Sequence, residues 1–191
     1  ARLFADKAWP RDTDERPHLF LGLNYRMTEL QAAVAREQLK KLAGVVDGRR
    51  KAAEPLTTAL DALPGLSAGL SEGATYWLFP VFVDPDLAGG DAHAYGRALA
   101  AEGIPANGGY IQRPLYRTPV LAERRTYGRS GYPLVSPPAS SVPSYAEGTC
   151  PHTEALIGQR LLVLQWNEHY TPDDVADFVA AFRKVHTAFT A

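Results

Sequence analysis

The sequence predicts an α/β fold of the α+β small-domain type, in which a small antiparallel or mixed sheet is packed with helices. Three segments support this prediction. The run Thr75–Val83 is rich in β-branched and aromatic residues, and Leu161–Leu164 is a short apolar run, as expected of strands. The segment after Thr171 instead places apolar residues at helical spacing. Strands interleaved with helices in this order fit one small sheet with helices packed on it.

The first predicted helix covers residues 28–47. Its start is marked by the capping-box spacing of Thr28–Gln31. Its apolar residues share one broad face: Leu30, Val34, Leu39, Leu42 and Val46. A second helix is predicted over residues 49–63, with a bend or break where Gly48 and Pro55 interrupt the pattern.

The centre of the chain predicts the sheet. In the first strand, Pro80 lacks an N–H group and therefore favours a sheet edge or a bulge. Residues 86–90 are predicted to be a loop, after which Asp91 caps a short helix that Gly103 ends. Residues 104–112 are predicted to form a second, distorted strand.

Residues 124–149 are rich in Pro, Ser, Gly and Tyr and are predicted to be irregular. Within them, Tyr127–Tyr132 is either a lid with a cationic side chain or a mobile surface loop. A short helix is predicted over residues 153–159. The last helix begins at Thr171 as N-cap, and its apolar stripe is predicted to be core: Val175, Phe178, Val179, Phe182, Val185 and Phe189.

Composition excludes several classes of protein. The formal net charge is −1 with mixed signs and no basic stripe, which argues against a nucleic-acid partner. No run of about 18 apolar residues occurs, so no membrane span is expected. The single cysteine, Cys150, excludes an internal disulfide framework and fits a reducing, cytoplasmic location.

The segment Gly22–Ala33 reads Gly-Leu-Asn-Tyr-Arg-Met-Thr-Glu-Leu-Gln-Ala-Ala. A turn that opens a helix presents free N–H groups, which suit an anion such as phosphate. Together with Gln38–Leu42, this segment resembles the DegT/StrS-type aminotransferases, pyridoxal-phosphate enzymes that aminate keto-sugars, keto-cyclitols and related carbocycles. The resemblance implies the C-terminal domain of a fold-type I, pyridoxal-phosphate-dependent homodimer. It also implies that Asn24 reaches the cofactor phosphate of the neighbouring subunit, with Arg26 near the same site.

A second segment, Gly103–Tyr116, is similar to the part of these enzymes that lines the substrate entrance. Tyr110 matches a tyrosine of the family, whereas Gly109 and Tyr116 stand where many members carry histidine. The resemblance therefore implies substrate-binding roles for Tyr110, Tyr116 and Arg113, and favours carbocyclic substrates over sugar nucleotides. The amino donor is expected to be glutamate or glutamine. From the residues alone, the glycines are equally a bulge and the tyrosines half-buried packing.

The lysine that would hold the cofactor is absent. Of the five lysines, Lys7 alone lies outside a predicted helix, and no context suggests a desolvated amine. The family resemblance places that lysine upstream, in a large domain supplied by the same polypeptide or by a separate chain. Residues 1–26 are therefore predicted to be the end of the large domain and a dimer-interface arm, and residues 27–191 the C-terminal small domain. The alternative is a non-catalytic dimerisation or binding module derived from this family.

Overall fold

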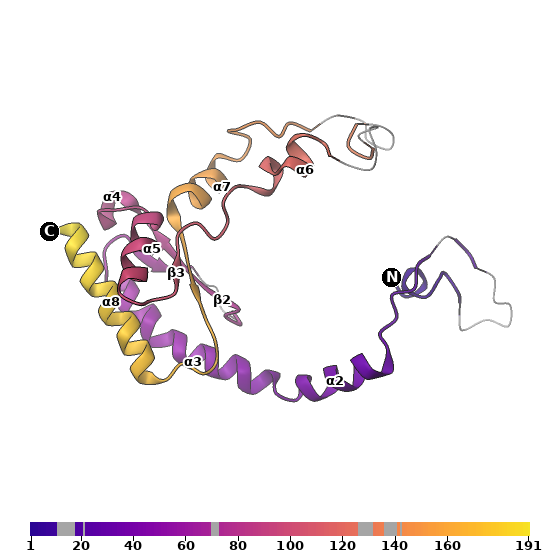
Figure 1. The fold of residues 1–191 in the computed structure, drawn as a ribbon, viewed down its shortest axis with the longest axis horizontal. Coiled ribbons are helices and arrows are strands. Elements are labelled where there is room, and N and C mark those ends of the chain that lie inside the picture. Colours follow the sequence, from indigo (N-terminus) through magenta and orange to yellow (C-terminus); the bar gives the residue numbers. More distant parts are fainter. Residues whose placement is uncertain (11–17, 21, 70–72, 126–131, 136–140, 142) are drawn as a thin grey trace. The chain divides into compact units, whose positions relative to one another are not determined.

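In the computed structural model, the described residues are 1–10, 18–20, 22–69, 73–125, 132–135, 141 and 143–191. The chain divides into two compact units, Ala1–Gly44 and Val45–Ala191 (Figure 1). The described helices and strands are α1 (Arg2–Ala5), α2 (Glu29–Leu39), α3 (Leu42–Asp61), β1 (Leu66–Ala68), β2 (Leu78–Val83), α4 (Pro85–Ala88), α5 (Ala92–Ala101), β3 (Ala106–Asn107), α6 (Pro119–Ala122), α7 (Pro151–Ala155), β4 (Leu161–Gln165) and α8 (Pro172–Thr190). Two shorter turns complete them, a 3₁₀ turn at Leu115–Arg117 and a π-helical turn at Leu156–Arg160.

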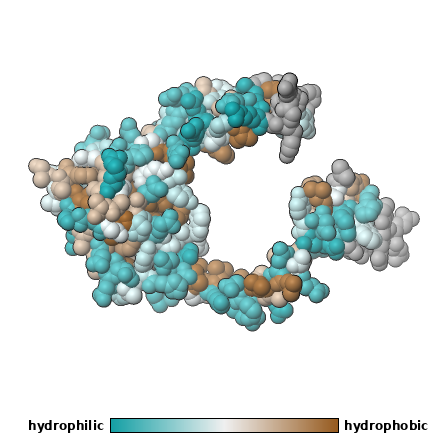
Figure 2. Space-filling model, in the orientation of Figure 1, coloured by the Kyte–Doolittle hydropathy of each residue, from teal (hydrophilic) through white to brown (hydrophobic). Residues whose placement is uncertain are grey.

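The first unit pairs Asp6, just after α1, with Asn24 in an isolated antiparallel bridge and then forms α2. Thr28 caps this helix as predicted, because its hydroxyl accepts from the Gln31 amide and the Gln31 side chain accepts from the Thr28 amide. No residue of α2 is buried, and Leu30, Val34 and Leu39 are all exposed. Their exposure gives α2 the hydrophobic surface that Figure 2 shows along this helix.

The predicted boundaries of the first two helices are wrong. The break lies at Lys40–Lys41, and α3 runs without interruption through Gly48 and Pro55. Gly48 is required by close packing rather than by a bend, because a Cβ there would lie 3.1 Å from the backbone oxygen of Glu168.

The second unit contains an antiparallel four-stranded sheet in the order β1-β2-β4-β3, which confirms the predicted fold class. Phe79 of β2 lies opposite Leu164 of β4, and Val81 lies opposite Leu162, so these four side chains share one face. All four are fully buried in a core with residues of α3, α5 and α8. The α8 stripe contributes to this core as predicted, with Phe178, Phe182 and Val185 buried and Val179 partly exposed.

Pro80 does not mark an edge or a bulge, because β2 lies between β1 and β4. The carbonyl of Pro80 accepts from the amide of Gly69, just beyond the last residue of β1. The N and C=O groups of one residue in an antiparallel strand point to the same side. The missing N–H of Pro80 therefore faces the place where the short strand β1 has ended, and no ladder bond of β1–β2 is lost.

Other predicted elements differ in extent. The predicted loop at 86–90 contains the short helix α4, capped by Asp84, and the predicted strand at 104–112 is reduced to the two residues of β3. Strand β1 was not predicted. The predicted helix capped by Asp91 is confirmed, and the Asp91 side chain accepts a hydrogen bond from the Ala94 amide. The run Arg11–Pro17 and all of the proposed lid except Tyr132 lie outside the described residues.

Candidate functional site

Asn24 and Arg26 lie in the first unit, on the segment that leads into α2. Asn24 pairs with Asp6 in an antiparallel bridge. The Arg26 guanidinium Nε lies 3.3 Å from the Asn24 side-chain oxygen Oδ1 and 3.2 Å from an Asp6 carboxylate oxygen. The backbone amide of Arg26 also donates to Asn24 Oδ1, at 3.3 Å. The structure therefore brings the two predicted phosphate-site residues into direct contact.

The Asp6 carboxylate lies near two cations, Lys7 and Arg26, that are both more exposed than it is. The Asp6 side chain is 13% exposed, whereas that of Arg26 is 52% exposed. Lys7 provides a second cation, with Nζ 3.9 Å from the Asp6 carboxylate. The Arg26 guanidinium thus brings a half-exposed cation beside the Asn24 amide, a group that attracts an anion. Asp6 was not predicted from the sequence, because its role depends on pairing with a segment far along the chain.

Arg113 and Tyr116 lie in the second unit. Arg113 lines a polar cavity of about 360 Å³ together with Arg117, Glu147 and Glu154. Tyr116 points its hydroxyl to the Glu154 carboxylate and accepts a hydrogen bond from the Cys150 amide at 3.3 Å. Burial and the hydrogen bond to Glu154 raise the pKa of Tyr116 above its ordinary value.

Glu154 gathers several donors around its carboxylate. The Gly148 amide donates to both carboxylate oxygens, at 2.9 and 3.0 Å, in addition to the bond from Tyr116. Glu154 of α7 therefore links the Gly148 amide at the end of the irregular segment to Tyr116 of the 3₁₀ turn. Tyr110 does not line the cavity of Arg113 and is 41% exposed, directly after the turn in which Asn107 accepts from the Gly109 amide.

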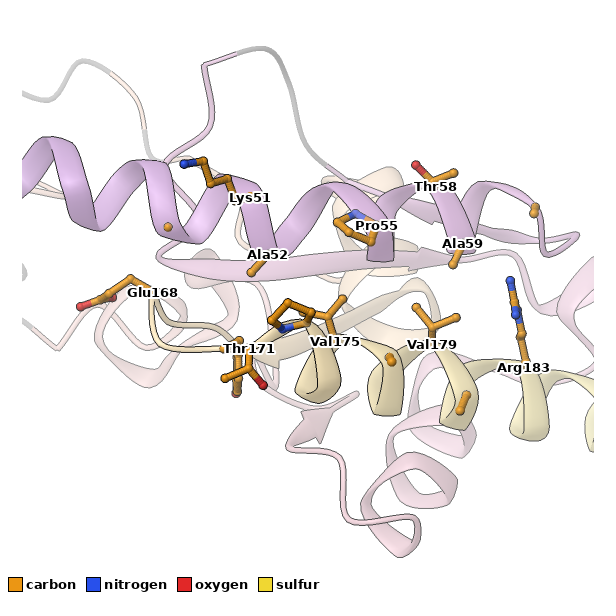
Figure 3. A pocket seen from close by; sticks show the side chains of 16 residues that line it. Lys51, Ala52, Pro55, Thr58, Ala59, Glu168, Thr171, Val175, Val179 and Arg183 are labelled. Carbon is orange, nitrogen blue, oxygen red and sulfur yellow. The ribbon is translucent and has the colours of Figure 1, made fainter.

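A cavity of about 960 Å³ forms an apolar groove between α3 and α8 (Figure 3). Ala52, Pro55 and Ala59 of α3 line it opposite Val175 and Val179 of α8. None of the residues predicted to bind cofactor or substrate lies in it. Small apolar side chains line much of the groove, and the charged residues Lys51, Glu168 and Arg183 also line it.

One end of this groove carries an ion pair. Glu168 accepts from Arg49 Nε at 2.9 Å, which links the loop before α8 to α3. A hydrogen bond from its own backbone amide, followed by the interaction with Arg49, lowers the pKa of Glu168. Trp166 strengthens the same link, because its indole N–H donates to the Arg49 carbonyl at 3.1 Å.

Neither a metal-binding cluster nor a membrane-spanning helix occurs in the described part of the chain. No group of three or more His, Cys, Asp or Glu residues there could hold a metal ion. Within the same residues, no helix has the length and apolar character needed to cross a bilayer.

A sequence profile of the DegT/DnrJ/EryC1/StrS aminotransferase family matches residues 1–183, and the chain belongs to this family. A comparison with curated proteins gives no match. Among solved structures, the chain is similar to the aminotransferase TlmJ from Streptoalloteichus hindustanus, with 22% identity and a TM-score of 0.64 over 100% of this chain and 44% of TlmJ.

Two further structures show the same fold. DesV from S. venezuelae is 22% identical, with a TM-score of 0.70 over 97% of this chain and 43% of DesV. The 3-amino-5-hydroxybenzoic acid synthase is 16% identical, with a TM-score of 0.66 over 98% of this chain and 46% of the synthase. The chain thus spans less than half the length of these structures, a coverage consistent with the predicted C-terminal domain. The predicted family is confirmed.

Proposed function

We propose that the chain is the C-terminal part of a pyridoxal-phosphate-dependent aminotransferase that moves an amino group from glutamate or glutamine to a keto-sugar or keto-cyclitol. The observation that carries this proposal is the contact of Asn24 with Arg26, inside the segment that resembles the family's phosphate-binding segment. Family membership supports a transferase, and the similar structures include the aminotransferase TlmJ and a 3-amino-5-hydroxybenzoic acid synthase.

The side chains present fit the cofactor's phosphate. Asn24 uses Oδ1 to accept from Arg26, and the structure shows no hydrogen bond from its Nδ2 amino group to any described residue. An amide N–H pair beside a guanidinium offers the donors and the positive charge that a phosphate needs. Asn24 and Arg26 would therefore hold the phosphate, across a homodimer interface according to the family resemblance.

The reaction chemistry is divided between the cofactor and an upstream domain. Pyridoxal phosphate, when bound, supplies the electron sink for amino transfer. The lysine that holds it is proposed to lie in the large domain upstream of residue 1. Residues 1–26 are proposed to end that domain and residues 27–191 to form the small domain. The single cysteine fits a cytoplasmic enzyme.

At the substrate site, the contacts favour different roles for the three candidate residues. Tyr110 has an exposed ring, and Arg113 brings a cation to the polar cavity. Both are proposed to contact substrate directly. The hydroxyl of Tyr116 already interacts with Glu154 and the Cys150 amide, so its proposed role is to shape the entrance.

The test uses the complete protein, incubated with pyridoxal phosphate and reduced with borohydride. Its intact mass is then measured by mass spectrometry. One reduced cofactor attached outside residues 1–191 is expected. Absence of any attached cofactor would favour the alternative, a non-catalytic dimerisation or binding module. Asn24→Ala should in addition weaken cofactor affinity, whereas the matched control Asn167→Ala should not, because the Asn167 side chain accepts only from the nearby His169 amide.

A further inference from the structure

The backbone places Asp6 and Asn24 face to face. The Tyr25 amide donates to the Ala5 carbonyl at 2.8 Å, and the Lys7 amide donates to the Leu23 carbonyl at 2.9 Å. These two bonds flank the Asp6–Asn24 pair, which is therefore a non-hydrogen-bonded pair of an antiparallel bridge. In such a pair the opposite side chains approach most closely.

A glycine permits this pairing. A Cβ on Gly22 would lie 2.7 Å from the backbone nitrogen of Ala8, so a larger residue would push the two segments apart. Ala8 is itself fully buried. The approach of the two segments is thus fixed by the backbone, before any side chain of the site is considered.

The side chains then form a chain of contacts that ends at the Asn24 amide. Arg26 lies two residues beyond Asn24, and its backbone amide donates to Asn24 Oδ1. Its Nε–H lies between the Asp6 carboxylate, at 3.2 Å, and Asn24 Oδ1, at 3.3 Å. With its Oδ1 held by two donors from Arg26, the Asn24 amide plane is oriented and its Nδ2 group is turned away from Arg26.

Asp6 is the group that holds Arg26 in this arrangement. A largely buried carboxylate requires a cation, whereas a half-exposed arginine side chain would otherwise sample several rotamers. We propose that Asp6 is a positioning residue of the phosphate site: it fixes Arg26 and, through Arg26, orients the Asn24 amide toward the anion. This inference rests on the proposed function for the identity of that anion.

The test uses the complete protein and titration of pyridoxal phosphate, followed by its absorbance. Asp6→Asn should raise the dissociation constant of the cofactor about three- to tenfold, which is the loss of affinity expected for one hydrogen-bonded contact. Combined with Asn24→Ala, Asp6→Asn should cost less affinity than it does alone, because the part of its effect that passes through the Asn24 amide is already lost. The matched control is Asp47→Asn, which removes an exposed carboxylate paired with Lys51 and should leave affinity unchanged.

A second readout does not depend on the cofactor. Labelling with ¹⁵N-asparagine reports the side-chain amides of Asn24, Asn107 and Asn167 separately. Asp6→Asn adds one new amide pair at the substituted position; it should also shift the Asn24 pair and leave those of Asn107 and Asn167 in place. Arg26→Lys, which breaks the same link without changing Asp6, should shift the same pair and should weaken affinity at least as much, because Arg26 is itself proposed to face the phosphate.

The outcomes separate the two proposals. Unchanged Asn24 amide signals in both variants would overturn the positioning role, whatever the cofactor does. A higher dissociation constant in Asn24→Ala but an unchanged one in Asp6→Asn would overturn this inference and leave the proposed function standing. An unchanged dissociation constant in Asn24→Ala would instead overturn the phosphate role itself, and the inference with it.

Discussion

The buried pair of Tyr95 and His186 gives the sharpest test of how the second unit is held together. Tyr95 is fully buried, and its hydroxyl donates to the Ala88 carbonyl at 2.9 Å. The same hydroxyl oxygen lies 2.9 Å from His186 Nδ1. A hydroxyl has one proton, so with that proton on the Ala88 side, His186 Nδ1 must carry a hydrogen and donate to Tyr95. Burial raises the pKa of Tyr95 to about 12, so the hydroxyl stays protonated.

Tyr95→Phe would remove this hydroxyl without changing the ring. The ring would keep its edge contact with Phe189, at 4.9 Å between centroids, so no large cavity would form. The cost would come from the Ala88 carbonyl and the His186 N–H, which would be left buried without a partner. We expect a loss of about 1–3 kcal/mol in the free energy of unfolding.

The measurement is urea unfolding of the chain at 25 °C, followed by far-UV circular dichroism. The matched control is Tyr110→Phe, which removes an exposed hydroxyl and should change stability by no more than about 0.5 kcal/mol. If Tyr95→Phe were as stable as this control, the hydroxyl would have no part in holding α4, α5 and α8 together. The reasoning would then be refuted.

Three further outcomes follow from contacts in the second unit. Thr171→Ala removes the capping box of α8 and should cost about 1 kcal/mol in urea unfolding, and an unchanged midpoint would contradict that cap. Burial lowers the pKa of His186 from 6.5, so the unfolded chain binds its proton first. Stability should therefore fall between pH 7 and 5, and an equal slope in His186→Gln would assign the fall elsewhere. Tyr116→Phe should speed hydrogen exchange at the Cys150 amide, and equal exchange in both proteins would count against that contact.

Local signals in the sequence predicted the elements whose causes are local. The cap at Thr171 and the apolar stripe after it define α8 without any partner. Pro80 gave a wrong prediction because its missing donor is harmless only where β1 ends, and β1 is three residues long with no alternation to reveal it. The break at Lys40–Lys41 likewise carries no glycine or proline signal.

The site could be predicted only in part, because only its local contacts leave a signal in the sequence. Asn24 and Arg26 lie close together in the sequence, within a motif, and the structure places them in contact. Asp6 and Glu154 were missed, because each meets its partner across a long separation in the chain. A carboxylate that neutralises an arginine or accepts from a tyrosine has no spacing rule that a single sequence displays.

The polar groups that are already hydrogen-bonded within the chain limit what each candidate residue can do. Tyr116 donates to Glu154, so a ligand could use its hydroxyl only by displacing a carboxylate that also holds the Gly148 amide. Asn24 differs, since among the described residues only its oxygen is engaged, which leaves its amino group as a donor beside a cation. An incoming anion would add bonds at Asn24 but would have to break them at Tyr116. This difference supports the proposal that Asn24, rather than Tyr116, meets the phosphate.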